Sequence, residues 1–257
     1  MIVDTHTHIS NSKFDKDREI VIQRAFDCGV KKMIEISCGV NCWDKALEIS
    51  KRDDIFVSFG IHPSDVSKVT QEDYDRLEFL IQNKKCVAIG ETGLDYHYDF
   101  SLQIIDVQME SFVKHLDLAA KYYMPVIIHC RDAYADMIIF FKRYAHRHSI
   151  PIGVVHCFSG TAKQAKEFIE MGFFLGIDGP ITYRKSGNLR QTVLETDINK
   201  LLVETDCPYL SVKKYKGQRN EPAYIVEIVK EIATIKSISI DDVAQITTEN
   251  AFKLFNI

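Results

Sequence analysis

The chain begins with Met1-Ile2-Val3-Asp4-Thr5-His6-Thr7-His8, in which a short apolar run leads directly into two histidines. In a β-strand, residues i and i+2 point to the same face. We therefore expect His6 and His8 to direct their imidazoles toward one point where the strand ends. Neutral imidazole is a common ligand of divalent metals. Histidines at this spacing also occur by chance on exposed strands, so the pair alone is weak evidence of a metal site.

Seven further apolar runs follow along the chain, each short and rich in Ile and Val, as is typical of buried parallel strands. With residues 1–3, the predicted strands are 32–36, 55–59, 86–89, 125–128, 153–155, 173–177 and 201–203. Amphipathic stretches predict helices at 15–28, 106–122, 132–143, 161–171, 221–235 and 241–255. Gly29 and Gly172 stand where a helix would stop before the next strand.

Eight β-then-α units in one chain predict an α/β fold, a (β/α)8 TIM barrel with its active site at the C-terminal ends of the strands. The alternative is an open doubly wound sheet. That fold would need a glycine-rich phosphate loop after an early strand, and the chain has no G-x-G-x-x-G. It also has no linker or low-complexity segment, so we predict that residues 1–257 form a single domain.

The composition is ordinary for a globular protein, with 46% hydrophobic and 26% charged residues and a net charge of −4. Any affinity for nucleic acid must therefore come from a local basic patch or a bound metal. The seven cysteines are irregularly spaced and do not indicate a secreted disulfide framework. We see no signal peptide and no membrane-spanning run, so we expect a cytoplasmic protein that does not bind membranes. We infer no protein partner and expect a monomer.

Side chains that can bind metal follow the apolar runs at equivalent places. The candidate metal ligands are His6, His8, Glu91, His129, His156 and Asp206. In a barrel, functional residues gather at the C-terminal ends of the strands, so these six would meet there. Any one histidine could belong to the core or the surface, but five of the nine, His62 included, follow strands in this way.

Four nitrogens and two carboxylates are more than one catalytic zinc ion uses. We therefore predict two divalent metal ions per chain, with Glu91 as the bridging carboxylate. His6, His8, Glu91 and Asp206 would hold one ion, and Glu91, His129 and His156 the other. The mixed ligand set suits Zn²⁺ or Mn²⁺ and tolerates Mg²⁺. Two ions about 3.5–4 Å apart can hold the attacking and leaving oxygens of a hydrolysis.

Two carboxylates have open roles. Asp206 could act as the general base that takes a proton from the attacking water. Glu204 would either hold a metal ligand in place or form a structural ion pair inside the barrel, and the sequence does not distinguish the two.

Several motifs together resemble the TatD family of metal-dependent hydrolases, within the amidohydrolase-like barrels. The matching stretches are residues 4–8, 60–63, 90–95, 129–133, 156–160, 204–210 and 219–222. The resemblance implies a deoxyribonuclease that acts as a 3′→5′ exonuclease on single-stranded ends, or a deacylase of D-aminoacyl-tRNA. It maps the family's metal ligands onto the same six residues and places His62 near the substrate phosphate. A related branch bridges its metals with a modified lysine, and Glu91 argues against that branch.

Two segments carry local positive charge, at 183–190 and 213–219, and both should open on the face of the metal site. We expect an anionic substrate, single-stranded DNA, to contact His62, Arg131, Lys213, Lys214 and Arg219. Tyr183, Tyr209, Tyr215, Phe158 and residues 96–98 could stack on bases. The alternative is a solvated basic rim and aromatic residues that cap the barrel. Residues 143–148, also basic, should lie on the opposite face and receive no role.

Three functions remain open at this stage. The first is hydrolysis of DNA phosphodiesters, and the second keeps the metals but cleaves an amide, ester or lactone. The third is a metal-stabilised scaffold without activity. Structural zinc sites are usually closed and rich in cysteine, so six histidine and carboxylate ligands at a barrel mouth argue against the third.

Overall fold

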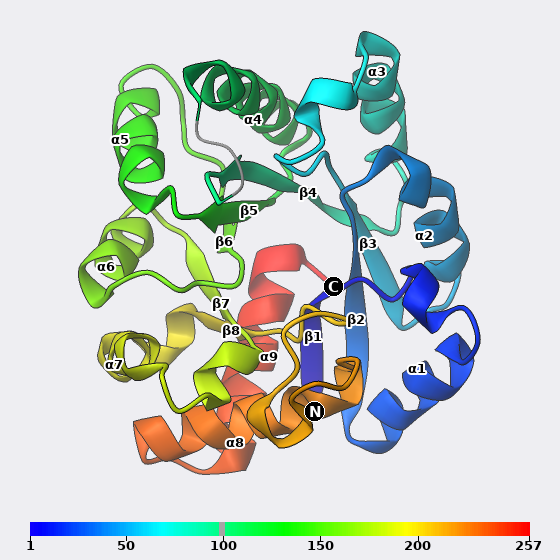
Figure 1. Ribbon diagram of the computed structural model, residues 1–257, viewed down its shortest axis with the longest axis vertical. Coiled ribbons are helices and arrows are strands. Elements are labelled where there is room, and N and C mark those ends of the chain that lie inside the picture. Colours follow the sequence, from blue (N-terminus) through cyan, green and yellow to red (C-terminus); the bar gives the residue numbers. More distant parts are fainter. Residues whose placement is uncertain (98–100) are drawn as a thin grey trace.

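The computed structural model describes residues 1–97 and 101–257, and its eight strands form one sheet in chain order. The strands are β1 (Ile2–Thr7), β2 (Val30–Ser37), β3 (Ile55–Phe59), β4 (Cys86–Asp95), β5 (Val126–Arg131), β6 (Gly153–Val155), β7 (Phe174–Ile177) and β8 (Leu201–Val203). Each strand pairs in parallel with the next one along the chain. The predicted (β/α)8 barrel is confirmed (Figure 1).

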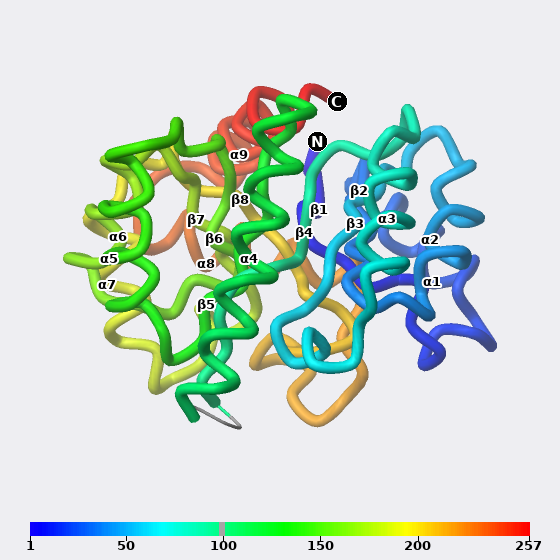
Figure 2. Tube along the Cα trace, turned by 90° about the horizontal axis from the view of Figure 1, so that it is seen from above, coloured from blue at the N-terminus to red at the C-terminus, as the bar shows by residue number. Residues whose placement is uncertain are grey.

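Helices surround this ring of strands on the outside, except the last one, which lies across one end of the ring (Figure 1 and Figure 2). They are α1 (Arg18–Asp27), α2 (Trp43–Ile49), α3 (Gln71–Leu80), α4 (Leu102–Tyr122), α5 (Tyr134–Tyr144), α6 (Ala162–Glu170), α7 (Gly187–Glu195), α8 (Ile225–Lys236) and α9 (Ile240–Phe255). Within the described ranges, none of these helices has the length and apolar character needed to cross a membrane.

The barrel has two apolar cores because successive side chains of a strand point to opposite faces. In β2, Met33 belongs to the cluster between the strands and the surrounding helices. Ile34 and Ile36 instead belong to the cluster inside the barrel, together with Leu254 and Phe255 of α9. Helix α9 therefore fills one end of the barrel with its apolar face.

The two ends of the barrel differ. Figure 2 shows α9 and both chain termini at one end, and the segment that follows β8 at the other. The hydroxyl of Thr248 in α9 donates to the carbonyl of Met1 at 3.0 Å, which fixes the start of β1 against this helix. The C-terminal ends of the strands, where the candidate ligands stand, are thus left facing away from α9.

The first and last strands meet at a short seam. Thr7 of β1 forms an isolated parallel bridge with Cys207, which follows β8. Two backbone hydrogen bonds of 2.9 Å frame it, from His8 N to Cys207 O and from Asp206 N to His6 O. The seam therefore aligns the two histidines of the opening stretch with Asp206.

The structure departs from the predicted elements in several places. Strands β1 and β5 continue past their predicted ends, to Thr7 and Arg131. Helices α2, α3 and α7 were not predicted, and β4 continues to Asp95 instead of ending at residue 89. Gly90 and Gly93 interrupt the apolar run after residue 89, yet a Cβ at either position would overlap a carbonyl oxygen of β5, that of Ile127 or that of His129. These glycines allow the backbones of β4 and β5 to approach closely, so the strand continues through them.

Candidate metal centre

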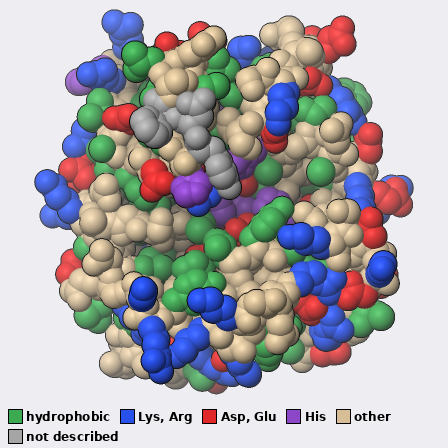
Figure 3. All heavy atoms as spheres, in the orientation of Figure 1, with side chains coloured by type: hydrophobic (Ala, Val, Ile, Leu, Met, Phe, Trp, Pro, Cys, Tyr) green, Lys and Arg blue, Asp and Glu red, His purple; other side chains and the backbone are tan. Residues whose placement is uncertain are grey.

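The structure brings all six predicted metal ligands together at the C-terminal end of the barrel. His6, Glu91 and His129 lie within β1, β4 and β5, and the other three follow β1, β6 and β8. A cavity of about 440 Å³ opens at this point and is lined by five of the six, His6 being fully buried. Histidine side chains are visible near the middle of this face in Figure 3.

Glu91 lies at the centre of the group. Its Oε1 is 2.6 Å from His129 Nδ1 and 3.0 Å from His156 Nε2. Its Oε2 is 3.5 Å from His6 Nε2. The two oxygens of one buried carboxyl therefore face different histidines.

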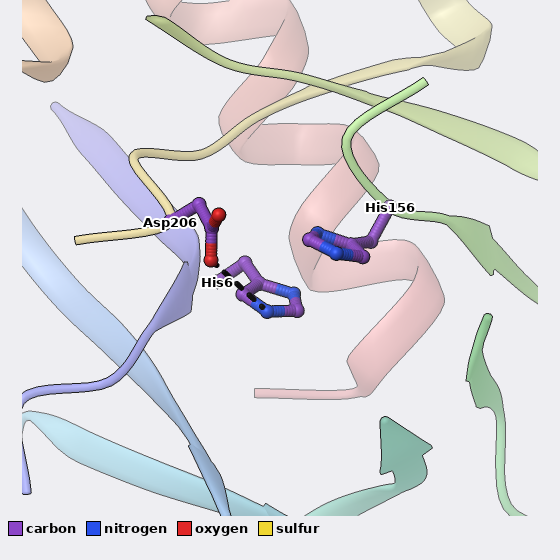
Figure 4. Close-up of side chains that lie close together, drawn as sticks. All are labelled: His6, His156 and Asp206. Atoms are coloured by element: carbon purple, nitrogen blue, oxygen red, sulfur yellow. Dashed lines mark ion pairs between the residues drawn. The ribbon is translucent and has the colours of Figure 1, made fainter. Parts of the chain in front are cut away.

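Asp206 completes the other side of the group. Its Oδ1 is 3.2 Å from His8 Nε2 and 3.7 Å from His6 Nε2. The rings of His6 and His156 stack with their centroids 3.7 Å apart, and Figure 4 shows both rings beside the Asp206 carboxyl. Side chains from β1 and from the segments after β6 and β8 thus converge on one small volume.

His6 shows that the arrangement fits a metal ion. It is fully buried, and neither of its ring nitrogens has a hydrogen-bond partner among the described residues. An unpaired polar group in a protein interior costs about 1–3 kcal/mol, so it calls for an explanation. Gaps of 3.5 Å to Glu91 and 3.7 Å to Asp206 are too long for hydrogen bonds. They match the spacing of atoms that share a metal with bonds of about 2.0–2.2 Å.

The electrostatics give three of these groups the protonation states that metal ligands need. Burial alone would raise the pKa of Glu91, but the charge of His156 and hydrogen bonds from the neighbouring histidines hold it well below its ordinary value. Burial alone would also raise the pKa of Asp206. The hydrogen bond from His8 and the charge of His156 outweigh this effect, so the pKa is lowered. Burial lowers the pKa of His6, so that its imidazole is neutral.

The remaining three histidines carry protons that balance the carboxylates. Burial lowers their pKa values, but the carboxylates outweigh it, and the pKa values of His8, His129 and His156 all rise. Binding of a divalent cation would displace these protons, because a nitrogen ligand must be deprotonated.

Buried carboxylates outside the ligand set hold it in place. Asp4 Oδ2 accepts a hydrogen bond of 2.6 Å from the hydroxyl of Thr205, and its Oδ1 accepts one of 2.9 Å from Thr205 N. Glu204 Oε1 accepts a hydrogen bond of 2.6 Å from Cys157 N and lies 3.3 Å from His156 Nδ1. The position of Glu204 against a candidate ligand favours the first of its two predicted roles.

Asp95 also belongs to the site, although the sequence does not single it out. Its Oδ2 is 3.0 Å from His129 Nε2, and with His62 these residues form a further group that could hold a metal ion. Because β4 continues to residue 95, Glu91 and Asp95 stand on the same face of one strand. A longer predicted strand would have revealed this pair.

The predicted substrate-binding residues fall into two sets. His62 and Arg131 line the cavity together with the candidate ligands. Lys213 and Lys214 line a separate hollow beside α8, and Lys214 Nζ is 3.3 Å from a carboxyl oxygen of Glu227. Arg219 donates to both oxygens of Asp17, at 2.8 and 2.6 Å, and to Glu221 at 2.9 Å.

The aromatic residues proposed to stack on bases also differ in position. Tyr209 lines the cavity and is 46% exposed. Phe158 is fully buried, and the ring of Tyr215 stacks on Tyr224. The hydroxyl of Tyr183 donates to the carbonyl of Ser211 at 2.7 Å. Residue 98 of the 96–98 stretch lies outside the described residues.

Comparison with known proteins shows the family to which the chain belongs. The family model described as TatD related DNase matches residues 3–256. The chain is 38% identical over 258 residues to the uncharacterized metal-dependent hydrolase YabD of Bacillus subtilis, with 100% of both chains covered. It is 32% identical over 260 residues to the 3′-5′ ssDNA/RNA exonuclease TatD of Salmonella typhimurium, which covers 99% of this chain and 98% of that protein. The crystal structure of YJJV, a TatD homologue from Escherichia coli, matches with a TM-score of 0.92 at 30% identity, covering 100% of this chain and 98% of that one. The chain therefore belongs to the TatD family of metal-dependent hydrolases.

Proposed function

We propose that this protein is a divalent-metal-dependent nuclease that hydrolyses phosphodiester bonds of single-stranded DNA from the 3′ end. The observation that carries the proposal is the Glu91 carboxyl, whose Oε1 faces His129 and His156 while Oε2 faces His6. A carboxylate placed in this way can bridge two ions. The relative named as a 3′-5′ ssDNA/RNA exonuclease supports this choice of substrate.

Two sets of residues would hold the ions. His6, His8 and Glu91 form one group of possible ligands, and Glu91, His129 and His156 form another. Asp206, which lies 3.2 Å from His8 and 3.7 Å from His6, would join the first. The mixed nitrogen and oxygen ligands suit Zn²⁺, Mn²⁺ or Mg²⁺. When bound, the ions would lower the pKa of the attacking water and stabilise charge on the leaving oxygen. All six residues come from one chain, so we propose that residues 1–257 act as a single catalytic domain.

Asp206 is the candidate general base. Its carboxyl is ionised because its pKa is lowered, and it lines the cavity that the substrate must enter. An ionised carboxylate in this position can accept the proton of the attacking water.

His62 and Arg131 would hold the phosphate. The backbone N–H of Ser64 donates to His62 Nδ1 at 3.1 Å, so Nδ1 is an acceptor and Nε2 carries the proton of the neutral ring. Burial lowers the pKa of His62 to about 4, which keeps the ring neutral. Its Nε2 lies 3.8 Å from Glu91 Oε1, next to the candidate centre, and can donate to a phosphate oxygen there.

The proposal is tested with a single-stranded oligonucleotide labelled at its 5′ end. Protein freed of metal with EDTA should release no nucleotides, and added Mn²⁺, Mg²⁺ or Zn²⁺ should restore products that shorten from the 3′ end. Asp206→Asn should lower kcat by at least about 100-fold, because an amide cannot accept the proton. Circular dichroism and metal content of the variant serve as controls. A variant as fast as the parent would refute the role of Asp206, and a metal-loaded parent that leaves DNA intact would refute the nuclease.

Acyl hydrolysis, including deacylation of D-aminoacyl-tRNA, is the second candidate. It is favoured by the pairing of Arg219 with Asp17 and by the separate hollow of Lys213 and Lys214, because few of the predicted cations reach the cavity. Replacing Arg131, a predicted cation that does line the cavity, by Gln separates the candidates. Loss of activity, together with a change in the steep salt dependence of the rate, supports DNA as the substrate. An unchanged rate supports a small acyl substrate.

A further inference from the structure

Tyr209 is an aromatic residue held firmly at the mouth of the cavity. Its backbone N–H donates to the carbonyl of Asp206 at 2.9 Å. The fully buried side chain of Asn220 donates to the carbonyl of Tyr209 at 2.7 Å. The backbone is thus fixed on both sides, while 46% of the residue stays exposed and the ring borders the cavity.

The ring lies next to the candidate metal centre. Its centroid is 5.8 Å from that of His8, with the two planes at 74°. Its hydroxyl accepts a hydrogen bond of 3.2 Å from Asn11 Nδ2, in the loop that follows His8. A half-exposed ring whose backbone is fixed beside the candidate centre offers a surface on which a base can stack.

Lys13 supplies a positive charge at the same place. Its Nζ lies 5.0 Å from the centroid of the Tyr209 ring, and no ion pair involves it among residues 1–97 and 101–257. Lys13 N donates to Asn11 Oδ1 at 3.0 Å, so the residue that contacts the Tyr209 hydroxyl also fixes the backbone of Lys13. The Lys13 ammonium lies over one face of the Tyr209 ring, so the ring offers its other face to a base while the cation offers its charge to the phosphate of the same nucleotide.

We propose that Tyr209 and Lys13 form a nucleotide subsite next to the scissile phosphate, in which the base stacks on Tyr209 and its phosphate pairs with Lys13. The inference rests on the proposed nuclease function and adds to it the part of the substrate that this rim recognises. Stacking accepts any base because every base has a π face, so the subsite favours single strands without selecting a sequence.

The test compares two oligonucleotides that differ only in the nucleotide adjoining the scissile bond, one with a base and one with a tetrahydrofuran abasic unit. Tyr209→Leu should lower kcat/KM on the first by about 10-fold or more and leave the second within about threefold. Tyr209→Phe keeps the aromatic face and should keep the preference for the base. Equal losses on both oligonucleotides would show a structural role and overturn the subsite.

Lys13 is tested through salt dependence. Lys13→Gln should reduce the slope of log Kd against log salt concentration by about the amount that one phosphate contact contributes. Lys16→Gln, which removes another exposed lysine of the same loop, is the matched control and should keep the parent slope. A slope unchanged in Lys13→Gln would remove Lys13 from the subsite.

A binding measurement separates the subsite from the nuclease proposal. An oligonucleotide with 2-aminopurine at the stacking position is titrated into the parent in EDTA, where no cleavage is needed. Stacking should quench its fluorescence in the parent and in Tyr209→Phe, but not in Tyr209→Leu. Quenching without any cleavage by metal-loaded protein would keep the subsite and overturn the nuclease. Cleavage without quenching would keep the nuclease and overturn the subsite.

Discussion

At the scale of single residues, Gly176 in β7 has no side chain, and the carboxyl of Glu204 occupies the space that one would fill. A Cβ at position 176 would overlap both oxygens of that carboxyl. Glu204 in turn lies against His156 Nδ1 and accepts from Cys157 N. The glycine therefore acts on the orientation of His156 through Glu204.

We expect Gly176→Ala to weaken metal binding and hydrolysis by about 10–100-fold, as is usual when the support of a metal ligand is removed. Competition with a coloured chelator measures the affinity. Gly187→Ala is the matched control, because a Cβ at the first residue of α7 would meet nothing within 4 Å. If Gly176 acts through Glu204, the double variant with Glu204→Ala should be little worse than Glu204→Ala alone. Fully additive losses would contradict that route.

At the scale of elements, α4 fastens the loop that carries His62. His115 of α4 is buried, and its Nδ1–H donates to the carbonyl of Ser111 at 2.7 Å. Its Nε2 therefore accepts, and it receives the N–H of Ile61 at 3.0 Å. This contact fixes the backbone directly before His62.

His115 gives the fold a dependence on pH. Burial lowers its pKa to about 4 from an ordinary 6.5, so between these values the unfolded chain binds more protons than the folded one. The contribution of His115 to the free energy of unfolding is complete above pH 6.5. As the pH falls toward 4, up to about 3 kcal/mol of this contribution is lost. Urea unfolding at several pH values should show the advantage of the parent over His115→Gln shrinking with acid. An advantage that stays constant between pH 7 and pH 4 would contradict this account.

The strands and helices also show how much of the fold can be predicted from the sequence. Apolar runs predict all eight strands because buried parallel strands are uniformly apolar. Helix α2 has seven residues, too few for a clear helical period, and α3 buries only Leu77 and Leu80. The capping box of Thr70 and Asp73 did mark the start of α3. Gly90 and Gly93 interrupt the apolar run of β4, so the sequence does not reveal that the strand continues to Asp95.

The candidate site was predictable to the extent that each ligand stands within or shortly after one of five strands. The supporting contacts were not, because they join residues far apart in sequence. Asp4 and Thr205 are separated by 201 positions, and His115 reaches Ile61 across 54. The course of the loop after β8, which turns Lys213 and Lys214 away from the cavity, likewise depends on packing against α8.

At the scale of the whole molecule, the candidate centre lies across the seam of the barrel. Thr7 and Cys207 join β1 to the segment after β8 by an isolated bridge. The proposed ligands His6 and His8 stand on one side of this bridge, and Asp206 stands on the other. A bound ion would therefore tie the first strand to the end of the last.

Metal removal should accordingly loosen the seam. At a metal concentration of 100 times Kd, binding adds about 2.7 kcal/mol to the free energy of unfolding, so EDTA should lower Tm. Hydrogen exchange should increase most in residues 2–8 and 204–208, with α6, which packs away from the seam, as the internal reference. A uniform increase over the barrel, or no change in Tm, would count against a metal at this position.

The position of the termini has a practical consequence. Both lie at the end of the barrel that α9 fills, and the cavity opens at the other end (Figure 2). A surface linker joined to either terminus would therefore anchor the molecule by its closed end, with the mouth toward the solution. Tethered in this way, single molecules could be tested for the proposed shortening of a strand held under tension from the opposite side.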